Sequence, residues 1–218
     1  MKNFLAGTLP FWDALTEEEK ERSLSNIETK AFPKGTVLYH VGMGEASFKI
    51  VRSGIIRVFI STPDGNEVTL YRLMGGDVCV LSVVCIMNAN SLDIHMEAET
   101  DSEVSMLPAW VYQRLNEENN AVKDFTQQIL TERFQAAMQV VSDLAFNNVG
   151  KRLAKGLLQQ MRLLDSKEIF ITHEALAKDI GSAREVVSRT LKHFENLGIV
   201  SLSRGKITIL DAEELEKQ

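Results

Sequence analysis

Residues 172–189, with the sequence THEALAKDIGSAREVVSR, decide the fold of this 218-residue chain. Thr172 can cap a first helix, and Gly181 can adopt the left-handed conformation that ends it. Ser182 can cap a second helix, so the stretch predicts a helix-turn-helix. The two helices are expected over residues 173–180 and 183–197.

A hairpin is expected after the second helix. Apolar runs at residues 199–202 and 206–210 flank a turn at Gly205. Arg204 and Lys206 border this turn, where basic side chains can contact phosphates. Two helices followed by such a hairpin make a winged helix-turn-helix.

The start of the second predicted helix carries side chains that can read DNA bases. Four of them share one face at helical spacing: Arg184, Glu185, Ser188 and Arg189. Arginine can bond guanine O6 and N7 together, and glutamate can accept from cytosine N4. A structural interpretation also exists, since Ser182 and Glu185 could form a capping box and Glu185 could pair with Arg189.

The charge distribution favours DNA binding over this structural interpretation. Residues 149–206 carry 11 Lys/Arg and 6 Asp/Glu, whereas residues 1–148 carry 12 Lys/Arg and 20 Asp/Glu. A basic segment in a chain of formal net charge −6 indicates a polyanionic partner for that segment. Thr172 and Ser182, at the predicted helix starts, are further candidate DNA contacts.

A long helix is expected upstream, because residues 109–148 contain neither glycine nor proline. A row of apolar residues repeats there with the spacing of a coiled-coil seam: Leu130, Phe134, Ala137, Val141 and Leu144. A second row flanks it: Ile129, Ala136 and Val140. We interpret one row as packing within the chain and the other as a dimer interface; the alternative is a core helix on the β domain. Asn147-Asn148 predicts a hinge, and a further helix is expected over residues 149–164.

Residues 31–107 have the texture of a β domain. Short runs rich in Val, Ile, Phe and Tyr alternate with glycine-containing turns, which is typical of a sandwich or roll. A helix over residues 11–28, capped by Asp13 or Thr16, is expected before it. The predicted fold class is therefore α+β: a β-roll, a long helix and a winged helix-turn-helix. The expected domains are a β-roll domain at 1–108, a dimerisation helix and hinge at 109–147, and a DNA-binding domain at 148–218.

The apolar runs and the number of cysteines indicate the cellular compartment of the protein. The longest apolar run in the expected core, residues 78–87, is about half of what a membrane span needs. The N-terminus lacks the apolar core of a signal peptide, and two cysteines cannot build a secreted disulfide framework. These features predict a cytoplasmic protein without a membrane partner.

Together these features resemble the superfamily of the cyclic-AMP receptor protein and the fumarate-nitrate-reduction regulator (Crp/Fnr), over nearly the whole chain. Residues 144–154 (LAFNNVGKRLA) look like the family's hinge, and residues 184–189 (REVVSR) look like its recognition motif. One departure is Thr190, where the family usually has an aliphatic residue. The resemblance implies Glu185 and Arg189 as base readers, Arg184 as a further reader or phosphate contact, and Ser188 as an auxiliary contact.

The resemblance also implies the assembly and the kind of sensor. It implies a bacterial-type homodimeric transcription regulator that binds a palindromic operator in double-stranded DNA and contacts RNA polymerase. The front domain would be a cyclic-nucleotide-binding-like roll, a double-stranded jelly roll, that senses a small effector. A change in the roll or in the helix register would re-orient the two winged helices.

The effector is not expected to be a cyclic nucleotide. The family holds the cyclic phosphate with an Arg-Ser pair, and the matching stretch here, residues 76–93, contains neither Arg nor Lys. A phosphate buried without a cation carries a large desolvation cost. An iron–sulfur cluster is not expected either, because residues 1–30 lack the N-terminal cysteines of the family's cluster-binding members.

Cys79, Cys85 and His95 are the remaining candidates for an effector or redox site. The family's carbon-monoxide sensors, which bind haem, have a cysteine where Cys79 lies, but Leu81 replaces their nearby histidine. A haem- or thiol-based sensor is therefore the alternative hypothesis. The simpler interpretation is that both cysteines are small buried hydrophobic residues. The effector remains unidentified by the sequence.

A cupin-like metal enzyme is the remote alternative. Such enzymes need a His-x-His pair with further ligands, whereas the histidines here are scattered at 40, 95, 173 and 193. No nucleophile–base arrangement or phosphate-binding loop stands out. The sequence therefore predicts neither a metal site nor an enzyme.

Overall fold

The computed structural model describes residues 1–39, 47–79 and 94–218. These residues divide into two compact units. The first comprises Met1–Ile60 and Leu70–Ala137, and the second comprises Ser61–Thr69 and Met138–Gln218. The fold is α+β, as predicted, whereas the domain limits expected above stay predictions.

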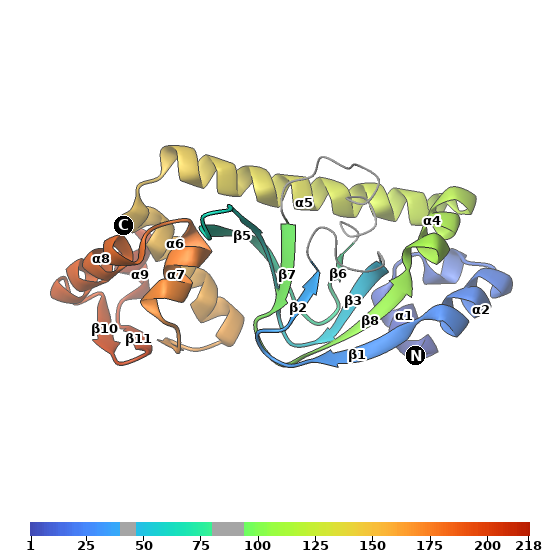
Figure 1. Ribbon diagram of the computed structural model, residues 1–218, viewed down its shortest axis with the longest axis horizontal. Coiled ribbons are helices and arrows are strands. Elements are labelled where there is room, and N and C mark those ends of the chain that lie inside the picture. The colour runs from blue at the N-terminus through green and yellow to red at the C-terminus, as the bar shows by residue number, and fades with distance from the viewer. Residues whose placement is uncertain (40–46, 80–93) are drawn as a thin grey trace. The chain divides into compact units, whose positions relative to one another are not determined.

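Two four-stranded sheets with antiparallel pairing form the roll (Figure 1). One has the order β1 (Glu28–Phe32), β8 (Ser102–Pro108), β3 (Ser47–Ser53) and β6 (Val78–Cys79). The other has the order β2 (Val37–Tyr39), β7 (Ile94–Ala98), β4 (Ile56–Ser61) and β5 (Glu67–Leu73). The expectation of a roll from short, turn-separated strands is confirmed.

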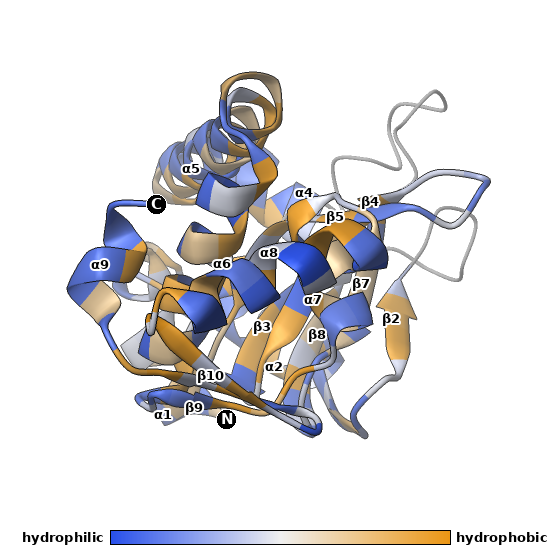
Figure 2. Cartoon of the chain, turned by 90° about the vertical axis from the view of Figure 1, so that its left-hand side faces the viewer, coloured by the Kyte–Doolittle hydropathy of each residue, from blue (hydrophilic) through white to orange (hydrophobic). Residues whose placement is uncertain are grey.

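Strand β3 separates two apolar clusters, and hydrophobic residues mark its middle (Figure 2). Phe48 and Ile50 are buried against helical residues such as Trp12, Val111 and Leu115, in a cluster called the helical cluster here. Phe48 stacks on Tyr112 of this cluster at 4.2 Å between ring centroids. Val51 belongs to a second cluster, called the roll interior here. Its buried members are Tyr39, Val51, Ile56, Val58, Tyr71, Leu73, Cys79, Met96, Ala98 and Val104.

Short helices precede the roll. They are α1 (Lys2–Thr8), the 3-10 helix η1 (Trp12–Ala14) and α2 (Glu17–Asn26). Thr16 caps α2 through a capping box, in which its Oγ1 accepts from the Glu19 N–H at 3.2 Å. The single helix expected over residues 11–28 is therefore wrong in extent, because this cap starts a new helix and Glu28 already belongs to β1.

The long helical region follows the roll. It consists of α4 (Ala109–Glu118) and α5 (Asn120–Phe146), which are separated at Asn119. Asn119 is extended, with φ −124° and ψ 118°, and its side-chain amide donates to the Ala14 carbonyl at 3.1 Å. The break at Asn119 is thus accompanied by a hydrogen bond to Ala14, which is far away in the sequence. The helix-favouring composition did not predict this break.

The second unit ends in a small mixed domain. Its elements are α6 (Val149–Leu164), β9 (Glu168–Ile169), α7 (His173–Ile180), α8 (Arg184–Asn196), β10 (Val200–Ser203), β11 (Lys206–Ile209) and α9 (Ala212–Glu216). The helix expected over residues 149–164 is confirmed, and Asn148 caps it by accepting from the Lys151 N–H at 2.9 Å. In the described ranges, no helix is long and apolar enough to cross a membrane.

Candidate nucleic-acid interface and effector domain

A turn at Gly181 joins α7 and α8 as the sequence predicts. Thr172 caps α7, because its Oγ1 accepts from the Ala175 N–H at 3.1 Å. Gly181 ends α7 with φ 64° and ψ 54°, a left-handed conformation that side chains resist. The Ser182 N–H then donates to the Ala177 carbonyl at 2.9 Å, which closes the turn.

The start of α8 differs from the expectation. Ala183, and not Ser182, is the N-cap, and no side chain caps this helix. Because the Ser182 backbone completes the turn, the helix begins one residue later, and the expected capping box with Glu185 is wrong. Within the described part of the chain, Glu185 and Arg189 do not form an ion pair either, so neither structural role expected for Glu185 is present.

The outer face of α8 is polar and open, while its inner face is buried. Val187 and Leu191 on the inner face are fully buried in the core of this unit. Ser188 is half-buried, and its Oγ lies 2.8 Å from Nδ1 of His173, a link to α7 that the sequence analysis missed. The remaining candidate readers are exposed: Arg184, Glu185 and Arg189.

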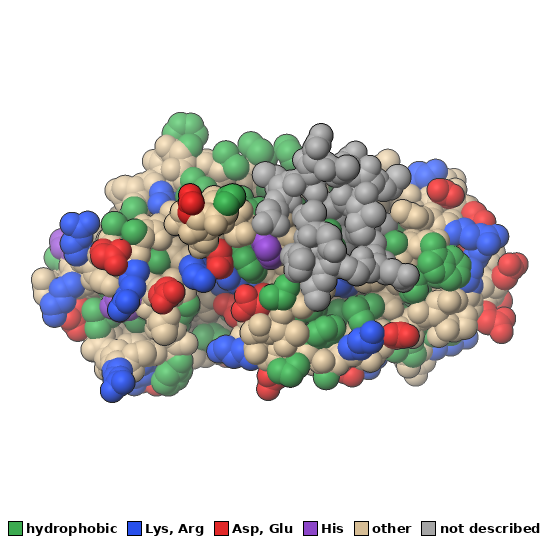
Figure 3. Space-filling model, in the orientation of Figure 1, with side chains coloured by type: hydrophobic (Ala, Val, Ile, Leu, Met, Phe, Trp, Pro, Cys, Tyr) green, Lys and Arg blue, Asp and Glu red, His purple; other side chains and the backbone are tan. Residues whose placement is uncertain are grey.

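The predicted wing is present as the hairpin of β10 and β11. Ser203 pairs with Lys206 across a turn in which Gly205 has φ 74°. Arg204 is exposed at the tip, whereas Lys206 Nζ lies 2.8 Å from Glu168 Oε1. Several Lys and Arg side chains lie over α8 and this hairpin in the space-filling view (Figure 3). Arg204 is thus the better placed of the two for a phosphate.

Arg152, on α6, connects the hinge with the helix-turn-helix. Its guanidinium donates to three backbone carbonyls: Asn147 at 3.0 Å, Ile180 at 3.2 Å and Gly181 at 3.3 Å. The last two belong to the C-terminal end of α7, where helix carbonyls lack partners and a cation is favourable. In the sequence, Arg152 stands out only as part of the hinge motif, because partners 28 and 29 residues away leave no local signal.

Replacing Arg152 by methionine should destabilise this unit. Hydrogen bonds to a charged group contribute about 1.5–3 kcal/mol each. Because Arg152 is only half-buried and the contributions of bonds to one group do not add, we expect a total loss of roughly 2–4 kcal/mol. Chemical denaturation followed by circular dichroism measures it. The exposed neighbour Lys151, changed to methionine, is the control and should stay within about 0.5 kcal/mol of wild type. Equal stability of the two variants would contradict the role of Arg152.

Helix α5 has two apolar faces, of which one is covered. Ile129 packs into the helical cluster beside the roll, and Ala136 packs against the roll interior. The predicted seam is divided, because Leu130 contacts the helical cluster and Ala137 is half-buried. The other large residues along this side are exposed: Phe134 (66%), Met138 (47%), Val141 (54%) and Leu144 (39%).

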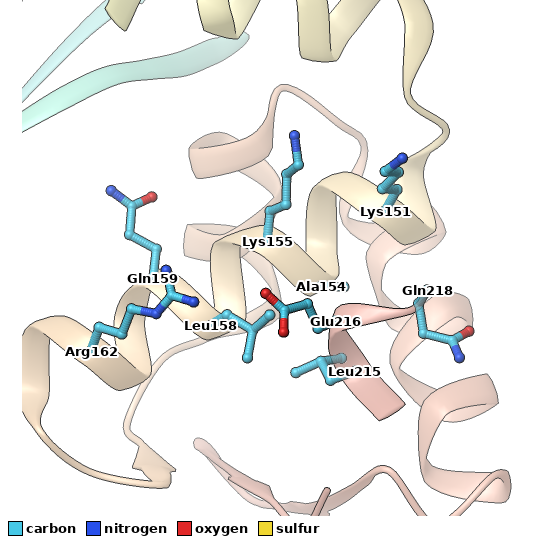
Figure 4. A pocket seen from close by; sticks show the side chains of 9 residues that line it. All are labelled: Lys151, Ala154, Lys155, Leu158, Gln159, Arg162, Leu215, Glu216 and Gln218. Atoms are coloured by element: carbon cyan, nitrogen blue, oxygen red, sulfur yellow. The ribbon is translucent and has the colours of Figure 1, made fainter. Parts of the chain in front are cut away.

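A hollow of about 300 Å³ lies between α6 and α9 (Figure 4). Leu158 and Leu215 form an apolar part of its lining, and Lys151, Lys155 and Arg162 contribute positive charge. None of its lining residues belongs to α8 or to the wing. We therefore do not include this hollow in the candidate DNA-binding surface.

The candidate effector residues lie on different sheets of the roll. Cys79 is buried on β6, and its register partner on β3 is Lys49. His95, on β7, stacks on Phe59 with 5.0 Å between ring centroids. Cys85 lies outside the described residues, as do Leu81 and most of the stretch without cations. Among the described residues, three or more metal-ligating side chains do not gather anywhere.

Two further cations border the roll interior. Arg72, on β5, makes a two-pronged contact with Glu99, with Nε–Oε2 at 2.6 Å and Nη2–Oε1 at 3.0 Å. The guanidinium of Arg133, on α5, lies 4.8 Å from the ring centroid of Tyr71.

Two parts of the chain match known protein domains. Residues 151–218 match the Crp-like helix-turn-helix domain, and residues 29–119 match the cyclic nucleotide-binding domain. A crystal structure of a putative Crp/Fnr-family transcriptional regulator from Eubacterium rectale is 35% identical and has a TM-score of 0.92. The match covers 97% of this chain and 98% of that one.

Two curated relatives agree with this match. The cyclic AMP receptor protein of Thermus thermophilus is 27% identical, over 95% of each chain. The cAMP-activated global transcriptional regulator CRP of Salmonella typhimurium is 25% identical, over 89% of this chain and 95% of its own length. The similarity to transcription regulators therefore extends across nearly the whole chain.

Proposed function

This chain belongs to the Crp/Fnr family of transcription regulators, and we propose that it is a homodimer that binds a specific DNA operator under the control of a small effector. The family consists of regulators with a helix-turn-helix, so the chain is not an enzyme, as the sequence predicts. The observation that carries the proposal is the exposed row Arg184, Glu185 and Arg189 at the start of α8.

This row has the chemistry of base recognition. Arg184 and Glu185 lie in the first turn of α8, the part of a recognition helix that contacts base edges. Since Glu185 has neither a capping role nor an ion pair with Arg189, both side chains are available for a G·C pair. Ser188, bonded to His173, supports the orientation of α8 on α7.

The exposed side of α5 supports the dimer. Large apolar side chains in one row along a helix are unfavourable in water and mark an interaction surface. A second copy of α5 presents the same row, so an isologous two-fold interface would cover both. This second copy also supplies the second recognition helix that a palindromic operator requires.

Selection of binding sites from random double-stranded DNA tests the proposal. The protein should enrich a palindrome whose half-sites are about one helical turn, ~34 Å, apart. Failure to enrich any sequence, or enrichment of a single half-site, would contradict a dimeric operator-binding regulator. RNA polymerase is the proposed further partner and the cytoplasm the proposed compartment, in keeping with the family resemblance.

The effector of the roll is, in this proposal, not a cyclic nucleotide. Residues 76–93 lack any Lys or Arg that could hold a cyclic phosphate. Arg72, a nearby alternative cation, is already bonded to Glu99 through two of its nitrogens. A haem- or thiol-based sensor stays the alternative. It depends on Cys79, Cys85 and His95, of which Cys79 and His95 belong to strands of different sheets and Cys85 lies outside the described residues.

Cyclic AMP should therefore bind weakly or not at all. Titration calorimetry of the purified protein with cyclic AMP, up to about 1 mM, should give no saturating heat, because residues 76–93, the stretch that matches the family's phosphate-binding stretch, contain no Lys or Arg. The relative from Thermus thermophilus, named as a cyclic AMP receptor, is the positive control. Micromolar binding at one site per protomer would refute this prediction.

A further inference from the structure

The side chain of Lys49 is buried inside the roll. Lys49 is 3% exposed and lies on β3 between Phe48 and Ile50, both of which face the helical cluster. Because side chains alternate along a strand, Lys49 points the other way. Its Nζ lies 5.5 Å from the ring centroid of Tyr39 on β2, a strand of the opposite sheet, and its register partner is Cys79.

The described partners of this ammonium are neutral. Nζ donates to Ser47 Oγ at 3.0 Å and, more weakly, to the Ser47 carbonyl at 3.4 Å. Among the described residues, no carboxylate forms an ion pair with Lys49, in contrast to Arg72, which has Glu99. Burial lowers the pKa of Lys49, which reflects the cost of an uncompensated charge in an apolar interior.

Such a lysine needs an explanation, because the burial of its charge costs free energy that no described carboxylate offsets. A buried cation that lacks a carboxylate is expensive, and an apolar residue of similar volume is often equally or more stabilising. Proteins retain unfavourable charges of this kind at functional sites. We propose that Lys49 binds the carboxylate of a small organic acid, the effector, whose apolar part contacts the roll interior. This inference rests on the proposed role of the roll as the sensor.

The donor set fits a carboxylate better than a phosphate. An ammonium has three N–H donors, and the Lys49 ammonium makes two hydrogen bonds, both to Ser47. One unit charge neutralises a carboxylate, whereas a phosphate monoester carries nearly two charges and more acceptor atoms, and it calls for further cations or backbone donors. Tyr39 and Cys79 lie next to Lys49, and Val51 is on the same face of β3. All three belong to the roll interior. These surroundings suit a ligand whose remaining part is apolar or aromatic.

Matched pairs of acids and amides test the site in the full-length protein without DNA. The probes are formate, acetate and benzoate, each compared with formamide, acetamide or benzamide, which have the same shape but no charge. Calorimetry and thermal unfolding are measured for wild type, for Lys49→Met and for Lys34→Met, an exposed control. We expect at least one acid to bind wild type and the control at least tenfold more tightly than its amide. Lys49→Met should remove this preference, and Lys49→Arg should keep part of it.

The unliganded proteins give a second measurement. If Lys49 is retained for the acid, Lys49→Met should unfold at the same temperature as wild type or higher, because it removes an uncompensated charge. Two results would overturn the proposal: wild type that binds no acid more tightly than its amide, or an undiminished preference in Lys49→Met. An acid preference that depends on Lys49 but leaves DNA affinity unchanged would support the site and would instead refute the regulatory role of the roll.

Discussion

Phe134→Glu should convert the protein from a dimer into monomers and reduce operator affinity by at least a hundredfold. Phe134 is 66% exposed on the uncovered side of α5, where the proposed partner copy would bury it. Burying a phenylalanine contributes about 1.5–3 kcal/mol per side chain, and two protomers would each lose it. The glutamate adds the desolvation cost of a buried charge, several kcal/mol, next to its like-charged counterpart. A monomer also holds only one recognition helix, so half of the operator contacts would be lost.

Light scattering and DNA titration measure these two effects. Gln135→Glu is the matched control, because it adds the same charge at an exposed position beside the row and should remain a dimer. Circular dichroism verifies that Phe134→Glu is folded, and Phe134→Ala provides a milder variant that weakens the dimer without adding charge. An intact Phe134→Glu dimer with wild-type affinity would refute the assignment of this row to the dimer interface.

Arg189→Ala should cost about 1–3 kcal/mol per half-site, or roughly 2–6 kcal/mol for a symmetric operator. The side chain is exposed on α8 and has no ion pair with Glu185, so its removal disturbs little within the folded protein. The lost bidentate contact should relax the preference at one G·C pair in each half-site. Selection from random DNA, repeated with the variant, detects that change directly, and identical motifs from both proteins would show that Arg189 does not read a base.

Arg204→Ala is the matched control for base reading. Arg204 lies at the exposed tip of the wing, and phosphate contacts carry no sequence information. This variant should weaken all sequences alike, keep the selected motif and lower the salt dependence by about one phosphate per protomer. Arg204 is preferred over Lys206, because the latter is bonded to Glu168 and its removal would free a carboxylate near the DNA.

The helix-turn-helix could be predicted in detail, since its signals are local. Thr172 caps α7 by a bond three residues along the chain, and Gly181 adopts a conformation that other residues resist. The same holds for α6, which begins after Asn148 where the hinge was expected. The start of α8 was misplaced by one residue, because Ser182 uses its backbone to bond Ala177 of the preceding helix.

The sequence by itself thus determined the succession of β-roll, long helical region and winged helix-turn-helix, the family resemblance and the identity of the candidate DNA-reading side chains, all of which depend on short spacings. Only the tertiary structure decided which side of α5 stays exposed, because that depends on packing of Ile129 and Ala136 against distant parts of the chain. It alone placed the Arg152 guanidinium on the carbonyls of α7 and the Lys49 ammonium between two sheets. A charge in a strand gives no local signal of its burial, since burial depends on neighbours from the other sheet.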